Sequence, residues 1–363
     1  MKTPQLLQLR LQNQSIAGTL FEKPADAVAR MGAVQAQDYP GALWAVGLRT
    51  HNAAEKDIEQ AIRERTIIRT WTLRGTLHIV AAADIRWLLD LLGPRLLAGA
   101  RGRHQQLGLD DTIFKTARDI LVHALQGGRQ LQRDEIFTLL EGASISTAGQ
   151  RGYHILWRLA VEGLLCFGAR RGKQPTFSLL DEWVPLAKKI DRDQALAEFA
   201  RRYFTGHGPA TLQDFVWWSG LTGTQARIGL DLVGAGLENT IIAGQTYWFP
   251  GSLPAVKEPS PAVHLLPAFD EYIVAYRDRA PVLEATRVKQ AISSNGIFYP
   301  TLVVDGRAGG TWKKAVKKDL LTITPNLFAP LTAAEEHAFR VEAGRYAAFM
   351  DLSLGSDSVL LNP

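Results

Sequence analysis

Cysteine is almost absent from this 363-residue chain, and long apolar runs are absent as well. The single cysteine, Cys166, excludes an internal disulfide, and its apolar neighbours predict a thiol packed in a buried strand. No group of cysteines and histidines has the spacing of zinc ligands, so we expect neither a metal nor another cofactor. No stretch reaches the roughly 18 apolar residues of a membrane span, and the first residues lack the apolar core of a signal peptide. These absences predict a cytoplasmic protein with no membrane partner.

The excess of positive over negative charge is also small. The net charge is +5 and the pI is near 9.3, which suits a polyanionic partner but is modest for this length. Charged residues make up 21% and hydrophobic residues 46%, a balance that excludes a disordered chain. Basic side chains gather in four clusters, each of which a solvated surface would also explain. The clusters are Arg101, Arg103 and His104; Arg170, Arg171 and Lys173; Arg277 and Arg279; and Lys313, Lys314, Lys317 and Lys318.

The second cluster falls in a turn between two predicted strands. The pattern predicts helices over 134–141 and 150–162, followed by strands over 164–168 and 176–179. Helix, helix, strand, basic turn and strand is the outline of a winged helix, in which this turn is the wing. We therefore expect the three basic residues of the turn to contact phosphate.

Two other segments show a similar order of elements. The first has predicted helices near 4–13, 25–34, 41–49 and 57–65 and strands over 67–72 and 76–80, joined at Arg74-Gly75. The other has helices over 211–220 and 222–233 and strands over 237–243 and 246–249. Its turn, Gly244-Gln245, has no positive charge, which weakens the case for DNA contact there. Its Trp217-Trp218 pair is more simply explained by core packing than by base stacking.

The last part of the chain has a different texture. A linker rich in proline and serine is predicted over 251–261, followed by short strands near 301–305 and 309–313 and a helix that begins at Thr332. The predicted fold class is α+β, with three tandem winged-helix units and a small β-rich C-terminal domain closed by a helix. The predicted boundaries are 1–125, 126–190, 191–250 and 251–363.

The tripeptide Gln35-Ala36-Gln37 stands out in the first unit. A predicted helix ends near Val34, and Pro40 disfavours helix in the residue before it, so the tripeptide lies on a short extended segment. Positions two apart share one face of an extended segment, which aims both amides the same way. From these residues alone, two hydrophilic loop side chains are the commoner explanation of so short a motif.

Three longer stretches favour a functional motif over two ordinary loop side chains. They are 31–49, which contains the tripeptide; 69–80, Arg-Thr-Trp-Thr-Leu-Arg-Gly-Thr-Leu-His-Ile-Val; and 264–272, His-Leu-Leu-Pro-Ala-Phe-Asp-Glu-Tyr. Together they resemble the AlkZ and YcaQ group of DNA glycosylases, whose fold is a set of tandem winged helices. The resemblance runs from about residue 5 to near residue 350. One branch of the group has Gln-apolar-Gln at its catalytic motif and another has Gln-apolar-Asp. The tripeptide resembles the first, AlkZ-like branch.

The chemistry of two glutamines fits a substrate that is already a good leaving group. A purine alkylated at N7 carries a positive charge, so the demanding step is stabilising the oxocarbenium ion that develops at C1′ of the sugar. An amide oxygen can hold and polarise a water there, although it cannot remove a proton as a carboxylate does. Gln35 and Gln37 are thus the predicted catalytic residues. Asp38 could act as a base, but we assign it as the N-cap of the next helix.

Asp270 and Glu271 receive no catalytic assignment, because acidic residues near DNA more often orient arginine. The predicted DNA contacts are basic. Alternation places Arg74, Thr76 and His78 on one strand face, although an outward polar residue on a half-buried strand explains His78 equally well. The full predicted set of DNA-binding residues is Arg69, Arg74, His78, Arg170, Arg171, Lys173, Arg307 and Lys313.

The sequence therefore predicts a monofunctional DNA glycosylase that hydrolyses the N-glycosidic bond of cationic N-alkylated purines such as N7-alkylguanine and N3-alkyladenine. The resemblance extends this expectation to bulky or crosslinked adducts. No lysine neighbours the glutamines in the sequence to form a Schiff base, so strand cleavage is not expected. The expected partner is double-stranded DNA carrying alkylated bases, bound by a monomer that is nucleoid-associated when on DNA. The alternative is a winged-helix transcriptional regulator that binds DNA without catalysis.

Overall fold

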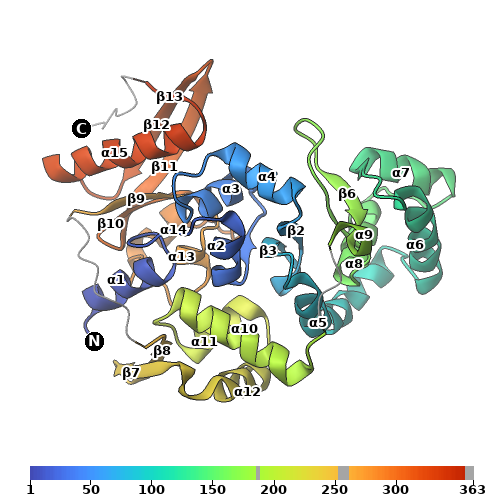
Figure 1. The fold of residues 1–363 in the computed structure, drawn as a ribbon, viewed down its shortest axis with the longest axis horizontal. Helices are drawn as coiled ribbons and strands as arrows, with labels where there is room; N and C mark the ends of the chain where they lie inside the picture. Colours follow the sequence, from blue (N-terminus) through green and yellow to red (C-terminus); the bar gives the residue numbers. More distant parts are fainter. Residues whose placement is uncertain (185–188, 252–260, 356–363) are drawn as a thin grey trace. The chain divides into compact units, whose positions relative to one another are not determined.

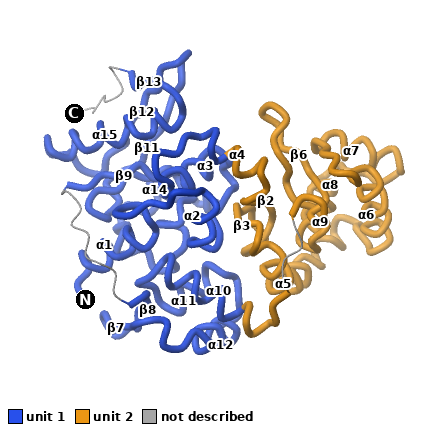
Figure 2. Tube along the Cα trace, in the orientation of Figure 1, with its two compact units in different colours: residues 1–58, 196–363 blue, residues 59–195 orange. Residues whose placement is uncertain are grey.

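The computed structural model describes residues 1–184, 189–251 and 261–355 (Figure 1). Helix accounts for 49% and strand for 20%, which confirms the α+β class. The chain forms two compact units (Figure 2). The discontinuous unit comprises residues 1–58 and 196–363, and the central unit comprises residues 59–195. The finer division into three winged-helix units and a C-terminal domain stays a prediction, and most of the predicted linker lies outside the described residues.

The first and middle parts of the discontinuous unit are mainly helical. Its N-terminal elements are α1 (Thr3–Asn13), α2 (Pro24–Met31), β1 (Val34–Gln35), α3 (Tyr39–Leu48) and α4 (Glu55–Arg63), which continues into the central unit. The elements after the central unit are α10 (Arg192–His207), α11 (Leu212–Ser219), α12 (Gly223–Val233) and the antiparallel hairpin of β7 (Glu238–Ile242) and β8 (Gln245–Phe249). Thr211 and Thr222 cap α11 and α12, as their positions before the apolar runs predicted.

A five-stranded sheet forms the last part of this unit, in the order β13-β12-β11-β10-β9. Its strands are β9 (Val263–Leu266), β10 (Thr301–Val304), β11 (Arg307–Lys317), β12 (Leu320–Leu327) and β13 (Ser353–Leu354), with α13 (Glu271–Val274) and α14 (Val288–Ala291) between β9 and β10. The pairs are antiparallel except β12 with β13. Helix α15 (Ala333–Phe349) packs against β9 (Figure 1). Its Tyr346 and Phe349 contact the ring of Trp44.

The central unit contains the winged-helix order of elements that the sequence predicted around residues 134–179. Its elements are β2 (Ile67–Trp71), β3 (Leu77–Ala81), α5 (Ile85–Gln106), α6 (Asp111–Leu125), β4 (Leu131–Gln132), α7 (Arg133–Gly142), α8 (Arg151–Val161), β5 (Leu165–Phe167), β6 (Thr176–Leu179) and α9 (Leu180–Trp183). Strands β4, β6 and β5 form one sheet, and the helices bury Leu121, Ile136 and Ile155 beside it. Cys166 lies in β5 with 1% of its surface exposed, and burial raises the pKa of its thiol. This confirms the packed thiol.

Three local expectations differ from the structure. The helix predicted over 25–34 ends at Met31 and not near Val34, because Gly32 adopts a left-handed φ of 74° that stops it. The turn between β2 and β3 is a 3₁₀ turn over Leu73–Gly75, in which Arg74 has a φ of 54°. Helices α5 and α6 had not been predicted from the sequence.

Candidate active site

The Gln35-Ala36-Gln37 motif lies where the chain passes from α2 to α3. Gly32 ends α2, β1 is extended, and Pro40 sits in the first turn of α3. The side-chain Nε2 of Gln35 donates a hydrogen bond of 2.5 Å to Oε1 of Gln37. Gln35 is 6% exposed, whereas Gln37 is exposed. The two amides therefore face the same way, as expected, with one anchored inside and the other at the surface.

A buried carboxylate holds the motif from inside. Glu271 is fully buried, and its Oε1 accepts a hydrogen bond of 2.9 Å from the backbone N–H of Gln35. Its Oε2 accepts one of 2.8 Å from the indole Nε1–H of Trp218 and lies 3.6 Å from Nε2 of His207. Trp218 is itself buried, which confirms its assignment to the core, whereas the same assignment of Trp217 was wrong, because 42% of its surface is exposed. Glu271 of α13 thus bridges β1 and α11, and it follows Gln35 by 236 positions in the sequence.

The neighbouring carboxylate of Asp270 orients an arginine, as its sequence context suggested. Both of its oxygens accept hydrogen bonds of 2.9 Å from Arg49, and both side chains are almost completely buried. Arg49 also donates to Oε1 of Gln14 and to the carbonyl of Ala45. A bidentate pair with these further partners satisfies a buried arginine. We call Gln14, Arg49, Trp218, Asp270 and Glu271 the buried network.

The stretch 264–272 is a scaffold for this network. The carbonyls of Leu265 and Leu266 accept hydrogen bonds from the indoles of Trp44 and Trp312 at 2.7 and 2.8 Å. The hydroxyl of Tyr272 donates to the carbonyl of Gly306 at 2.8 Å. Burial lowers the pKa of His264 to about 4, so its ring is neutral at pH 7. The two indole bonds and the Tyr272 hydroxyl bond fix the segment that delivers Glu271 to the motif.

Asp38 occupies the N-cap position of α3, next to the motif. Burial raises the pKa of its carboxyl, while the backbone N–H of Gly41 and the ammonium of Lys314 partly offset that shift. Lys314 belongs to β11, and its Nζ donates a hydrogen bond of 2.5 Å to the hydroxyl of Tyr346. Burial lowers the pKa of Lys314. Sequence reasoning missed this approach of a lysine to Asp38, because its only signal was membership in a basic cluster.

The central unit holds three of the predicted DNA-binding residues. Arg69 is half-buried with its guanidinium 4.7 Å from the centre of the Phe167 ring, and Arg74 is partly exposed in its 3₁₀ turn. His78 has no exposed surface, and its Nδ1 lies 3.0 Å from the carbonyl oxygen of Thr76. The phosphate contact predicted for His78 therefore does not fit this structure, because the ring points into the packed interior.

The wing of the central unit is the loop between β5 and β6, which extends from the unit (Figure 1). Its two arginines meet carboxylates: Arg170 lies 3.5 Å from Glu59, and Arg171 lies 3.0 Å from Glu135. Lys173 is exposed and makes no ion pair within the described residues. The Gln132 backbone N–H and Arg171 lower the pKa of Glu135. The wing is therefore basic overall but already partly neutralised.

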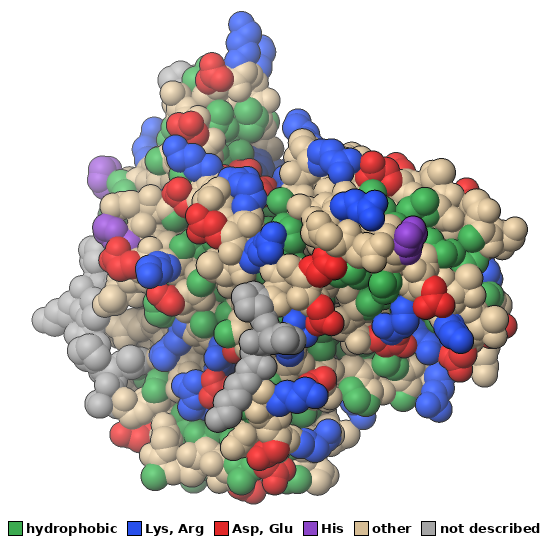
Figure 3. Space-filling model, turned by 45° about the vertical axis from the view of Figure 1, so that its right-hand side comes forward, with side chains coloured by type: hydrophobic (Ala, Val, Ile, Leu, Met, Phe, Trp, Pro, Cys, Tyr) green, Lys and Arg blue, Asp and Glu red, His purple; other side chains and the backbone are tan. Residues whose placement is uncertain are grey.

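Arg307 and Lys313 are exposed on β11, in the discontinuous unit. The β11 and β12 strands form a long hairpin whose turn at Lys318 has a φ of 55°. Lys317 and Lys318 lie at that turn. Elsewhere the visible surface mixes basic and acidic side chains and shows no continuous basic face (Figure 3).

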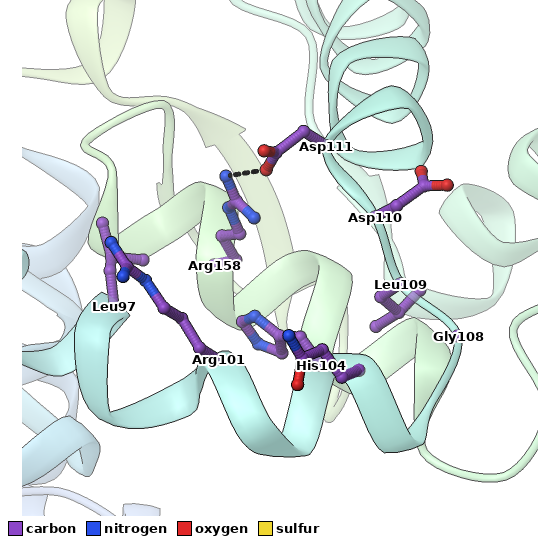
Figure 4. Close-up of a pocket in the computed structure, with 9 residues that line it drawn as sticks. Leu97, Arg101, His104, Gly108, Leu109, Asp110, Asp111 and Arg158 are labelled. Carbon is purple, nitrogen blue, oxygen red and sulfur yellow. Dashed lines mark hydrogen bonds and ion pairs between the residues drawn. The ribbon is translucent and has the colours of Figure 1, made fainter.

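A hollow of about 690 Å³ lies in the central unit between α5, α6 and α8 (Figure 4). Its ionisable lining residues are Arg101, His104, Asp110, Asp111 and Arg158. Asp110 caps α6 through the N–H of Ile113, Asp111 pairs with Arg158 at 2.9 Å, and burial lowers the pKa of His104. The acidic groups of the hollow therefore stabilise the fold, and neither glutamine of the motif lines it.

Over the residues that the structure describes, no three acidic, cysteine or histidine side chains come together as metal ligands. In the same part of the chain, no helix is long and apolar enough to span a membrane.

Comparison with known proteins decides the family. The family model of DNA glycosylase AlkZ-like proteins matches residues 28–349. The chain belongs to the AlkZ-like DNA glycosylase family. This AlkZ-like chain is 26% identical over 362 residues to an interstrand DNA cross-link repair glycosylase of Streptomyces sahachiroi, covering 93% of this chain and 95% of the relative. The solved structure of the Streptomyces sahachiroi DNA glycosylase AlkZ has the same fold, with a TM-score of 0.77 at 24% identity, covering 98% of this chain and 99% of that one.

Proposed function

We propose that this AlkZ-like glycosylase hydrolyses the N-glycosidic bond of cationic N-alkylated purines in duplex DNA, with Gln35 and Gln37 as its catalytic residues. The observation that carries the proposal is the 2.5 Å hydrogen bond between the two amides, one buried and one exposed. A pair held in this way presents a fixed dipole and a water-binding edge at the surface, which is what a developing oxocarbenium ion requires.

The substrate class follows from what the amides cannot do. Neither glutamine can remove a proton from water or protonate a departing base. N7-alkylguanine and N3-alkyladenine leave readily because they carry a positive charge, whereas uracil and 8-oxoguanine do not. Glu271 is no alternative base, since its two oxygens already accept hydrogen bonds from Gln35 and Trp218 beneath the motif. Asp38 is the nearest such candidate in the sequence; it occupies the N-cap position of α3, and we assign it no proton transfer.

Bulky and crosslinked adducts belong to the proposed substrate range. The support is the Streptomyces relative, an interstrand DNA cross-link repair glycosylase that matches nearly the whole chain. The remaining basic candidates, Arg69, Arg74 and the wing residues of the central unit together with Arg307 and Lys313, would bind the phosphates of the duplex. We propose that the protein works as a monomer and that it leaves the abasic strand uncut, because no lysine neighbours the glutamines in the sequence to form a Schiff base.

The test is release of 7-methylguanine from a defined duplex, followed as alkali-labile sites under single-turnover conditions. Exchanging Gln35 or Gln37 for Ala should slow release by about 10- to 1,000-fold, a loss of roughly 1.4 to 4 kcal/mol of transition-state stabilisation. Affinity for the duplex should barely change. If both variants work at the wild-type rate, the catalytic assignment is wrong. Robust release of uracil by the wild-type protein contradicts the proposed mechanism, because a stronger acid or base must then act.

The alternative function, a transcriptional regulator, predicts a different result in the same assay. A regulator prefers one DNA sequence and leaves no alkali-labile sites, whereas the proposed enzyme is indifferent to sequence and leaves them. The family match favours the enzyme.

A further inference from the structure

We propose that Glu271 is a positioning residue for catalysis: its carboxylate sets the place of Gln35 through the Gln35 backbone N–H. The proposal rests on the proposed function, because it assumes that Gln35 acts on the substrate. It concerns a residue whose side chain is fully buried and reaches the reaction through Gln35. Sequence reasoning gave Glu271 no role in catalysis.

The two carboxylate oxygens of Glu271 each accept one hydrogen bond, an arrangement that we call the clamp. Oε1 of Glu271 accepts a hydrogen bond of 2.9 Å from the backbone N–H of Gln35, and Oε2 accepts one of 2.8 Å from the indole N–H of Trp218. A hydrogen bond to a buried carboxylate is short and strong, and it fixes the direction of its donor. The backbone of Gln35 fixes where its side chain starts, and that side chain holds Gln37.

Trp218 closes the clamp on the other side. The tip of its ring would lie 3.4 Å from a Cβ added at Gly32, the residue that ends α2 and begins the motif segment. The indole therefore packs against the start of this segment while its N–H holds Glu271. An error of about 1 Å in the place of a catalytic group can cost about 100-fold in rate, so a clamp of this kind has a kinetic effect.

The substitution Glu271→Gln breaks the clamp in a defined way. A carboxylate accepts on both oxygens, whereas an amide has one acceptor and one donor group. The new NH₂ must therefore face either the N–H of Gln35 or the N–H of Trp218. Because a buried donor is then left without an acceptor, the segment shifts. We expect base release to slow by about 10- to 100-fold with little change in affinity for DNA.

A second substitution should rescue the first. In the double variant Glu271→Gln, Trp218→Phe, the amide oxygen can accept from Gln35 while its NH₂ faces Nε2 of His207. That nitrogen has no hydrogen-bond partner within the described residues, and Nδ1 of the same ring lies 3.3 Å from the carbonyl of Tyr203, which favours a proton on Nδ1. Nε2 is then free to accept. The double variant should release base within about threefold of Trp218→Phe alone, since every donor again has an acceptor.

A matched control is Thr301→Val, which removes a hydroxyl that donates a hydrogen bond to the carbonyl of Tyr299 in the discontinuous unit, outside the stretch 264–272. It should lower thermal stability and keep the rate of base release. All rates are measured in single turnover at saturating enzyme, well below each melting temperature.

The outcomes separate the two proposals. If Gln35→Ala is slow but Glu271→Gln works at the wild-type rate, the positioning role is overturned and the proposed function stands. A double variant that releases base much more slowly than Trp218→Phe alone also overturns it. Should Glu271→Gln fail to fold, the double variant, in which each donor has an acceptor, carries the test against Trp218→Phe. If Gln35→Ala and Gln37→Ala are both fully active, the catalytic assignment itself fails.

Discussion

The buried network beneath the motif and the wing of the central unit use the same residue types in opposite settings. Arg49 and Asp270 form a bidentate pair with almost no exposed surface, and their neighbours satisfy the remaining groups. Arg171 of the wing meets Glu135 of α7 at 3.0 Å, and 54% and 42% of these side chains are exposed. A buried pair that loses one member leaves an uncompensated charge, whereas an exposed pair exchanges easily with water and ions. The buried pair suits a site that must keep one geometry. The exposed pair suits a DNA-binding surface, where the arginine can leave its carboxylate and bind a phosphate.

The largest expected effect comes from breaking the buried pair. Asp270→Ala leaves the guanidinium of Arg49 without its carboxylate, and it removes the cap of α13 as well. We expect the free energy of unfolding to fall by about 3 to 5 kcal/mol. Urea unfolding of the variant measures this loss, with Arg171→Ala, which breaks the exposed pair at the wing, as the counterpart. A loss below about 1 kcal/mol would show that the network does not differ from a surface pair.

The next effect is a dependence of stability on pH that comes from His264. Its folded pKa is about 4, below its ordinary value of 6.5, because of burial. Between these two values the unfolded chain binds a proton that the folded chain does not, so stability is full above pH 6.5 and is lost as the pH falls towards 4. The loss should reach about 3 kcal/mol.

Unfolding in urea at pH 7, 6, 5 and 4 tests this expectation. The variant His264→Leu should lose stability less steeply over that range, and substitution of the exposed His51 by Gln should leave the slope of the wild-type protein unchanged. Equal slopes for His264→Leu and the wild type would show that other groups set the acid sensitivity.

A smaller effect is expected on the wing. Replacing Arg170, Arg171 and Lys173 by Ala should weaken binding to damaged and undamaged duplex alike. The slope of log affinity against log salt should fall by up to about 0.9 per lost contact. Glu135→Gln sharpens the comparison, because it frees Arg171 from its carboxylate and should tighten binding. An unchanged salt slope in the triple variant returns the cluster to ordinary solvated surface.

The smallest expected effect is none at all. Borohydride reduction of reactions with an N7-methylguanine duplex should trap no covalent complex, because no lysine neighbours the glutamines in the sequence. Trapping with a Schiff-base lyase run in parallel shows that the assay works. A trapped complex that disappears in Lys314→Ala would make this protein a strand-cleaving glycosylase.

Local sequence patterns predicted much of the fold, but they did not predict contacts between residues that are far apart in the sequence. Alternation and turn residues predicted β5, β6 and the wing, and Pro40 predicted the extended motif. Burial of His78 was not predictable, because strand alternation assigns a face but not which face is covered. The contact of Glu271 was not predictable either. No local sequence pattern indicated that this acidic residue, next to the arginine-binding Asp270, would accept a hydrogen bond from a backbone N–H 236 positions away.

That separation has a consequence for synthesis. The central unit is inserted between the two halves of the discontinuous unit, so residues 59–195 leave the ribosome before the partners of Gln35 exist. Translation at about 5 to 20 residues per second puts more than ten seconds between the glutamine pair and Glu271. Until Trp218 and Glu271 have emerged, the nascent chain carries the motif without the groups that hold it, and an active glycosylase can arise only late in the making of the protein.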